Sequence, residues 1–118
     1  MEKTQDGLWI IDEEARTVYA NARMTEILGA QLSEMLGQPS FMFVFPDDVK
    51  AAQALFEAKI RGNTNPFRFK LRRKDGSGIW VDVQAHPMHN AQGNFKGIVG
   101  TFTVSQAIAA RAEDGHSK

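Results

Sequence analysis

The chain contains no cysteine in its 118 residues. Disulfides, thiolate nucleophiles, thiolate metal sites and cysteine-linked chromophores are therefore all excluded. The chain also lacks an excess of charge of either sign, because 14 Lys and Arg balance 14 Asp and Glu. Nucleic acids and anionic membranes attract basic surfaces, so the sequence predicts neither as a partner.

Long apolar runs are missing as well. No run approaches the roughly 20 residues of a membrane-spanning helix, and the stretch from Met1 to Gly7 lacks the apolar core of a signal peptide. The length fits one domain, and 42% hydrophobic with 24% charged residues is close to the average of globular proteins. We therefore expect a single folded domain in the cytoplasm, with no membrane segment.

Two hydrophobic periodicities divide the chain. Apolar residues recur every three or four positions in much of the first half, as in amphipathic helices, and at every second position from Phe67 onward, as in half-buried strands. The predicted helices are 21–29, 32–36 and 46–61. The predicted strands are 8–11, 18–20, 67–72, 79–86 and 95–104. This order predicts an α+β fold in which the helices pack on one face of a five-stranded antiparallel sheet.

Several short motifs occur along these elements. They are Asn21-Ala22 with Glu26-Ile27-Leu28-Gly29, then Ser33-Glu34-Met35-Leu36-Gly37, Phe45-Pro46-Asp47-Asp48, Arg73-Lys74-Asp75-Gly76-Ser77 followed by Trp80-Val81, and the glycines Gly93, Gly97 and Gly100. In their identity, order and spacing they resemble the PAS superfamily, especially the bacterial type of sensor kinases and diguanylate cyclases. The resemblance implies a non-enzymatic sensory domain over residues 6–105, with a tail at 1–5 and the start of an exit helix at 106–118.

The chain departs from the PAS pattern in three places. Thr103-Val104-Ser105 stands where the family often has Asp-Ile-Thr, whose Asp usually forms a polar latch at the end of the last strand. Glu14-Ala15-Arg16 replaces the usual Asp-Gly turn of the first hairpin, and Phe45 replaces a His. The first of these departures bears on how a signal leaves the domain.

PAS domains usually enclose a cavity between the sheet and its helices, and the resemblance implies one here. The expected lining is apolar: Ile27, Phe43, Leu55, Phe56, Phe67, Phe69, Val81, Val83 and Phe102. These residues either surround a small ligand or simply fill the core, since aromatic side chains of this size can close a small cavity. The sequence leaves both interpretations open.

The sequence names no obligatory cofactor. A covalent flavin adduct is excluded by the absence of cysteine, whereas non-covalent flavin is not. Haem is disfavoured because no histidine lies between Pro46 and Arg61, and Met42 is interpreted as core filling. His86 and His89 are interpreted as solvated histidines and not as a metal site, since alternation directs them to opposite faces of a strand.

The face of the sheet opposite the helices offers a candidate contact surface. Trp9, Trp80, Val99 and Thr101 are expected there, and exposed tryptophans on a sheet usually mark a binding surface. The basic row Arg68, Lys70 and Arg72 alternates with apolar residues, so it is expected to face away from the cavity. We expect this face to form a homodimer or to receive a flanking helix.

The expected function is therefore signal relay. A small ligand or dimerisation would change the packing of helices on the sheet, and the last strand would pass the change to an output domain, as in a histidine kinase of a two-component system or a cyclic-di-GMP enzyme. Three alternatives stay open: a filled-core interaction module, a redox or gas sensor with haem or flavin, and a small isomerase-like enzyme. An isomerase would need a Tyr and an Asp in an apolar pocket, for which only Tyr19 and Asp82 are candidates.

Overall fold

A computed structural model describes residues 6–105 as one antiparallel sheet with helices on one side. The strands in this range are β1 (Gly7–Asp12), β2 (Thr17–Ala20), β3 (Phe67–Arg72), β4 (Gly78–His89) and β5 (Phe95–Val104). The helices are α1 (Ala22–Leu28), α2 (Leu32–Met35) and α3 (Val49–Ile60), with short 3-10 helices η1 (Ser40–Phe43) and η2 (Pro46–Asp48). The predicted α+β fold is confirmed. The predicted tail at 1–5 and exit helix from residue 106 lie outside the described residues.

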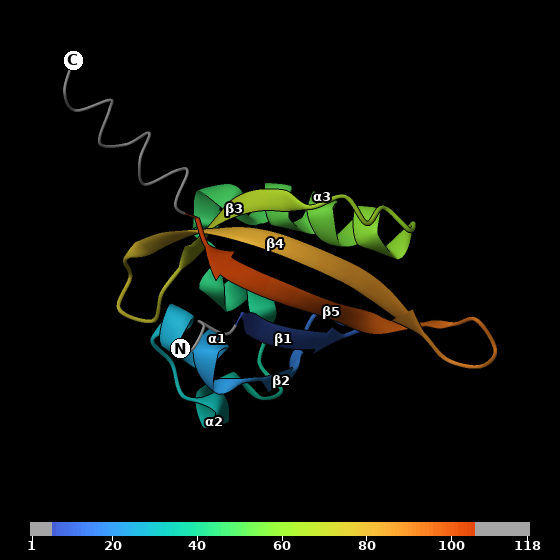
Figure 1. The fold of residues 1–118 in the computed structure, drawn as a ribbon, viewed down its shortest axis with the longest axis horizontal. Helices are drawn as coiled ribbons and strands as arrows, with labels where there is room; N and C mark the ends of the chain where they lie inside the picture. The colour runs from blue at the N-terminus through green and yellow to red at the C-terminus, as the bar shows by residue number, and fades with distance from the viewer. Residues whose placement is uncertain (1–5, 106–118) are drawn as a thin grey trace, which may run out of the picture.

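The sheet has the order β2-β1-β5-β4-β3, which places the last strand in its centre (Figure 1). β5 pairs with β1 along one edge and with β4 along the other. Gly100 of β5 lies between Trp9 of β1 and Ala85 of β4. Because side chains alternate along each strand, these residues share the face that meets the helices. The central position of β5 makes it the strand through which the two halves of the sheet are joined.

β4 continues to His89, beyond the predicted end at residue 86, even though it contains Pro87. β3 pairs with β4 only as far as the Phe67–Val83 pair, so the following residues of β4 have no strand on that side. Proline is tolerated in a strand where its missing N–H faces no neighbour. The β4–β5 hairpin therefore extends past the rest of the sheet, as its long projection shows (Figure 1).

Asn21 connects the first strand to the first helix. Its side-chain oxygen accepts hydrogen bonds from the backbone N–H groups of Met24 and Leu8, both at 2.9 Å. The first bond caps α1, because the N–H groups of a first helical turn have no partner inside the helix. Gly29 ends the same helix with φ of 67°, a left-handed conformation that favours glycine.

The Asp-Gly-Ser turn between β3 and β4 is closed by Asp75. Its carboxylate accepts from the Ser77 hydroxyl at 2.6 Å and from the Ser77 backbone N–H at 2.9 Å. These bonds hold the pKa of Asp75 below its usual value, because they favour the ionised form. The backbone N–H of Lys74 donates to the Leu28 carbonyl, so the turn is also joined to the end of α1.

The main core lies between α1, α2 and the sheet. Its largest fully buried side chains are Met24, Ile27, Leu28, Met35 and Val81. α3, by contrast, lies along β3 and β4 (Figure 1). Its apolar side chains are half-buried or exposed. Among the residues of α3, only Lys59 is buried. The domain thus has a tightly packed end at α1 and a looser layer beneath α3.

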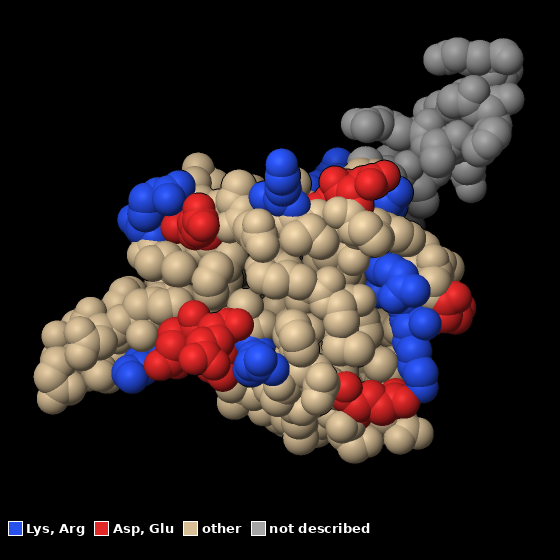
Figure 2. Space-filling view, turned by 180° about the vertical axis from the view of Figure 1, so that it is seen from behind, with Lys and Arg blue, Asp and Glu red and all other residues tan. Residues whose placement is uncertain are grey.

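Figure 2 shows charged side chains of both signs in small separate groups, with uncharged surface between the groups. This face therefore shows no large field of one sign, which agrees with the balanced composition. Within residues 6–105, no helix combines the length and apolar character needed to cross a membrane.

Candidate functional site

An apolar cavity of about 120 Å³ lies between α3 and the sheet. α3 supplies Ala52, Leu55, Phe56 and Lys59 to its wall, and η1 supplies Ser40 and Phe41. The sheet side is formed by alternating inward residues of four strands. They are Trp9, Ile11, Phe67, Phe69, Leu71, Val83, Ala85, Ile98, Gly100 and Phe102. The cavity therefore joins the long helix to the central strand β5.

The structure brings six of the nine expected lining residues together around this cavity. They are Leu55, Phe56, Phe67, Phe69, Val83 and Phe102. Ile27, Phe43 and Val81 are buried elsewhere in the core and do not line it. Ile27 belongs to α1 and packs beside Gly7 of β1, whereas the cavity lies under α3.

The expected position of Trp9 has to be corrected. It is 6% exposed and faces the cavity, not the outer face. Its indole N–H donates to the Thr17 hydroxyl at 2.9 Å, and its ring contacts the rings of Phe43 and Phe102. The apolar run at residues 8–11 does not alternate, so the sequence could not show which of its residues point inward.

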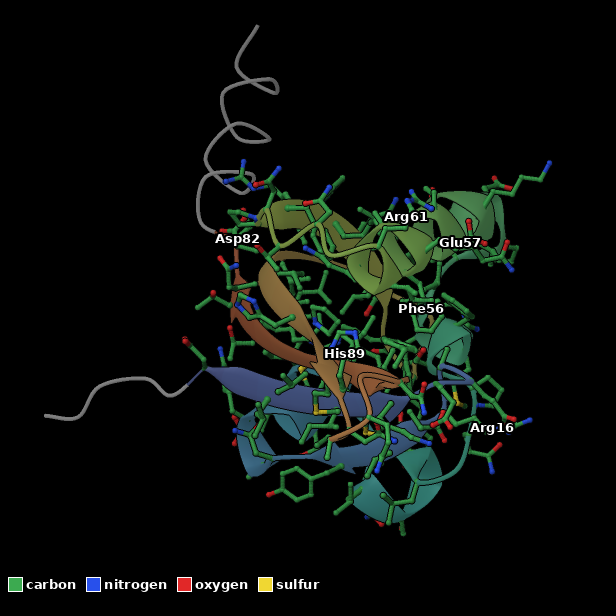
Figure 3. The ribbon with its side chains drawn as sticks, turned by 90° about the vertical axis from the view of Figure 1, so that its right-hand side faces the viewer. Arg16, Phe56, Glu57, Arg61, Asp82 and His89 are labelled. Carbon is green, nitrogen blue, oxygen red and sulfur yellow. The ribbon has the colours of Figure 1, made fainter. Side chains whose placement is uncertain are left out.

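Aromatic rings form one end of the cavity region. Phe56 contacts Phe41 and Phe95 edge-on, with ring centroids 6.4 and 6.0 Å apart, and Phe95 contacts His89. Figure 3 shows Phe56 between α3 and the strands, while Glu57 and Arg61 lie on the far side of the helix. Edge-to-face packing of this kind fixes ring orientation and adds about 1 kcal/mol per pair.

Lys59 is the one charged side chain in the wall and is 3% exposed. Its ammonium donates to the Asn65 carbonyl at 2.8 Å and lies 5.1 Å from the centre of the Phe67 ring. Burial lowers the pKa of Lys59, because the charged form loses hydration. No Asp or Glu in residues 6–105 forms an ion pair with it.

Sequence reasoning did not select Lys59. The signal was nonetheless present, because residues 52, 55, 56 and 59 repeat at i, i+3, i+4 and i+7 and place a lysine where an apolar residue is expected. Ile60, the apolar residue next to Lys59 in the sequence, is 38% exposed instead. The position of Lys59 on the apolar face of the predicted helix thus indicated that it belongs to the cavity wall.

The outer face of the sheet carries an apolar row across the three strands β2, β1 and β5. Ile10 pairs with Tyr19 and with Val99, and Val99 pairs with His86. We call Leu8, Ile10, Tyr19 and Val99 the outer patch. Leu8, Ile10 and Val99 are half-buried and Tyr19 is exposed.

Two other residues expected on the outer face lie there as well. Thr101 is exposed beside the outer patch, opposite Leu8. Trp80 is 40% exposed, and its backbone carbonyl accepts from the Ser105 N–H at 2.9 Å. Trp80 therefore marks the end of the sheet at which β5 leaves the domain.

The residues considered for other chemistry lie away from the cavity. Asp82 pairs with Arg68 at 2.6 Å on the side of the sheet opposite α3 (Figure 3), and Tyr19 is exposed on β2. Met42 was expected to fill the core but is 45% exposed, because Ser40 and Phe43 take the buried positions of η1, and it is not part of the wall. In the described part of the chain, no three His, Asp or Glu side chains are close enough to hold a metal ion.

Comparison with known proteins identifies the family. The family model described as the PAS fold matches residues 1–104. The chain belongs to the PAS family. A PAS domain from Colwellia psychrerythraea has the same fold, with a TM-score of 0.79, 16% identity and coverage of 86% of this chain and 87% of that one. A light-oxygen-voltage domain studied with a flavin analogue aligns with a TM-score of 0.75 and 25% identity over 96% of this PAS chain and 87% of the other.

The PAS chain is also similar to a sensor protein. It is 29% identical over 116 residues to the C4-dicarboxylate transport sensor protein DctS of Rhodobacter capsulatus. The match covers 92% of this chain but only 18% of the relative, so the chain spans less than a fifth of that protein's length. This PAS domain is therefore related to a sensory protein much longer than itself.

Proposed function

We propose that this PAS domain is a non-enzymatic sensor that binds a small molecule beneath α3 and relays its presence to an output domain. The observation that carries the proposal is the cavity of about 120 Å³ under a helix whose apolar side chains are half-buried or exposed. An engineered apolar cavity of about 150 Å³ in another protein binds benzene. A space of this size is therefore enough for a ligand of a few carbon atoms.

The relation to the DctS sensor supports a signalling protein as the parent. A sensor histidine kinase of a two-component system is the first choice for the output and a cyclic-di-GMP enzyme the second. In such a parent, residues 6–105 form the sensory domain, 1–5 belong to the preceding tail and 106–118 begin the exit helix on the cytoplasmic side. C4-dicarboxylate transport is the process that the relative's name gives, and it becomes a candidate process for this parent.

The relay would run through β5. Ile98, Gly100 and Phe102 of this strand line the cavity, and the strand ends beside Trp80. A ligand that fits one packing of α3 on the sheet better than another shifts the balance between them. Couplings of this kind are typically about 1–3 kcal/mol, enough to change an output several-fold.

The unusual exit sequence fits a relay made by packing and backbone bonds. Val104 faces inward opposite Val81, Thr103 lies opposite Asp82 on the outer face, and the N–H of Ser105 bonds to β4. Thr103, which is exposed on the outer face, thus stands in the place of the Asp that forms the family's polar latch. We expect the exit to respond to shifts of the strand as a whole.

Dimerisation through the outer patch would complete the sensor. Its residues lie in one contiguous area next to Thr101, with Trp80 at the exit end of the same face. Exposed apolar area on a small domain usually marks a contact surface. We propose a homodimer at this face, or a flanking helix of the parent packed against it.

A cofactor sensor is the second candidate, because the light-oxygen-voltage relative is named with a flavin analogue. The residues do not fit that group in this arrangement. The cavity is close in volume to one that holds a single benzene ring, whereas a flavin has three fused rings. Lys59 and Ser40 are also the wall's only residues with a polar side-chain group other than the Trp9 indole.

Native mass spectrometry of the protein purified from its own host tests the proposal. We expect an added mass of a small molecule on the wild type and on Ala51→Leu, which alters the exposed side of α3. Ala52→Leu places the same side chain in the cavity wall and should remove that mass. A bare, colourless dimer in all three samples would favour the filled-core interaction module, and visible absorbance would favour a cofactor.

A further inference from the structure

We infer that the ligand of this cavity is a small monocarboxylic acid whose carboxylate pairs with the ammonium of Lys59. The inference rests on the proposed function, because it assigns a chemical class to the ligand of the same cavity. It is carried by the contrast between one buried cation and a wall that is otherwise almost entirely apolar.

The first step concerns the charge of Lys59. A buried ammonium is stable only when hydrogen bonds and an opposite charge replace its lost water. Lys59 donates one hydrogen bond, to the Asn65 carbonyl, and has the Phe67 ring beside it. No carboxylate of residues 6–105 pairs with it, so an anion held beside Lys59 in the cavity would supply the opposite charge that it lacks.

The second step concerns the rest of the wall. Apart from Lys59 and Ser40, it consists of apolar side chains, Gly100 and the Trp9 indole, whose N–H is already bound to Thr17. Such a wall favours a hydrocarbon chain or ring and offers a partner for a single negative charge. A second carboxylate placed against the apolar part of this wall would lose hydration without gaining a partner. The wall therefore selects a monocarboxylate over a dicarboxylate.

The third step concerns size and place. A volume of about 120 Å³ suits a tail of a few carbons, comparable with benzene. Lys59 is in the last turn of α3, whereas Ala52 is two turns earlier on the same face. A short aliphatic acid can extend from the ammonium along this face of the helix. Hexanoate is a suitable probe because it combines one carboxylate with such a tail.

Isothermal titration of the purified chain with hexanoate, 1-hexanol and succinate tests the inference. Hexanoate should bind the wild type and Lys50→Met, a matched control at an exposed lysine of the same helix. Lys59→Met should weaken hexanoate binding about tenfold or more, because it removes a charge-assisted hydrogen bond, and should leave 1-hexanol binding unchanged or stronger. Succinate should not bind detectably.

Nuclear magnetic resonance of the Lys59 side chain adds a readout that a purely structural lysine would not give. Bound hexanoate should raise the pKa of Lys59, since a nearby anion favours the charged form, whereas 1-hexanol should not. Equal hexanoate affinity of the wild type and Lys59→Met, with both variants folded, would overturn the inference. Binding of 1-hexanol without hexanoate would overturn it as well and leave the cavity as a site for a neutral ligand. Binding of neither probe would count against the inference and the proposed function together.

Discussion

Replacing Ala52 with leucine tests whether unfilled space lies between α3 and the sheet. Ala52 is half-buried in the cavity wall, and the change adds three carbon atoms at that position. Each fully buried methylene contributes about 0.8 kcal/mol, so three contribute roughly 2.4 kcal/mol at most. Because the position is only half-buried, we expect the free energy of unfolding to rise by about 1–2 kcal/mol. In a closed core the same change would cost about 1–3 kcal/mol.

Urea denaturation followed by circular dichroism gives this free energy directly. Ala51→Leu is the matched control, because it makes the same substitution on the exposed side of the helix, where effects stay within about 0.5 kcal/mol. Alanine and leucine have similar helix propensities, so helix formation itself changes little. A loss of more than about 1 kcal/mol in Ala52→Leu alone would refute the reasoning, since it would mean that α3 packs on the sheet without a cavity.

Three further predictions concern other parts of the chain. Lys59 has a lower pKa in the folded state than in the unfolded state, so the unfolded state keeps its proton to higher pH. The free energy of unfolding should therefore rise with pH, from the folded-state pKa of Lys59 up to its unfolded value of about 10.4. Urea titrations at successive pH values should show this rise in the wild type but not in Lys59→Met. Gly97→Ala should lower the free energy of unfolding by about 3 kcal/mol or more, because its φ is 144° and a Cβ would collide with a backbone carbonyl of β1; Gly93→Ala, which also has a positive φ but open space around it, should lose only about 1 kcal/mol. Val99→Lys in the outer patch should convert a dimer to a monomer in sedimentation velocity, whereas Gln92→Lys in the β4–β5 turn should not, and a wild type that is monomeric at high concentration would contradict the proposed interface.

Most of the fold was predictable because its signals are local. Alternation fixed the inward residues of β3 and β4, and Asn21 and Gly29 marked the ends of α1 through capping bonds that depend on a few neighbouring residues. The true end of β4 was not predictable in this way. It depends on the absence of a neighbouring strand beyond Val83, which only the assembled sheet determines.

The site was predictable only in part. Phe67, Phe69 and Val83 follow from strand alternation once α3 is placed over that face. The prediction for Trp9 was wrong because a continuous apolar run does not show which of its side chains point into the core. Lys59 was missed because charged residues on helices are usually exposed. No sequence pattern predicts that the carbonyl of Asn65, in the following loop, accepts a hydrogen bond from its ammonium.

Amide NMR of the chain during titration with 1-hexanol tests most directly whether the cavity is a ligand site that β5 senses. The account predicts saturable shifts at the wall residues Phe56 and Phe67, together with shifts that continue along β5 from Ile98 to Val104. Shifts confined to the outer patch, or no saturable shifts up to the solubility of the alcohol, would contradict it.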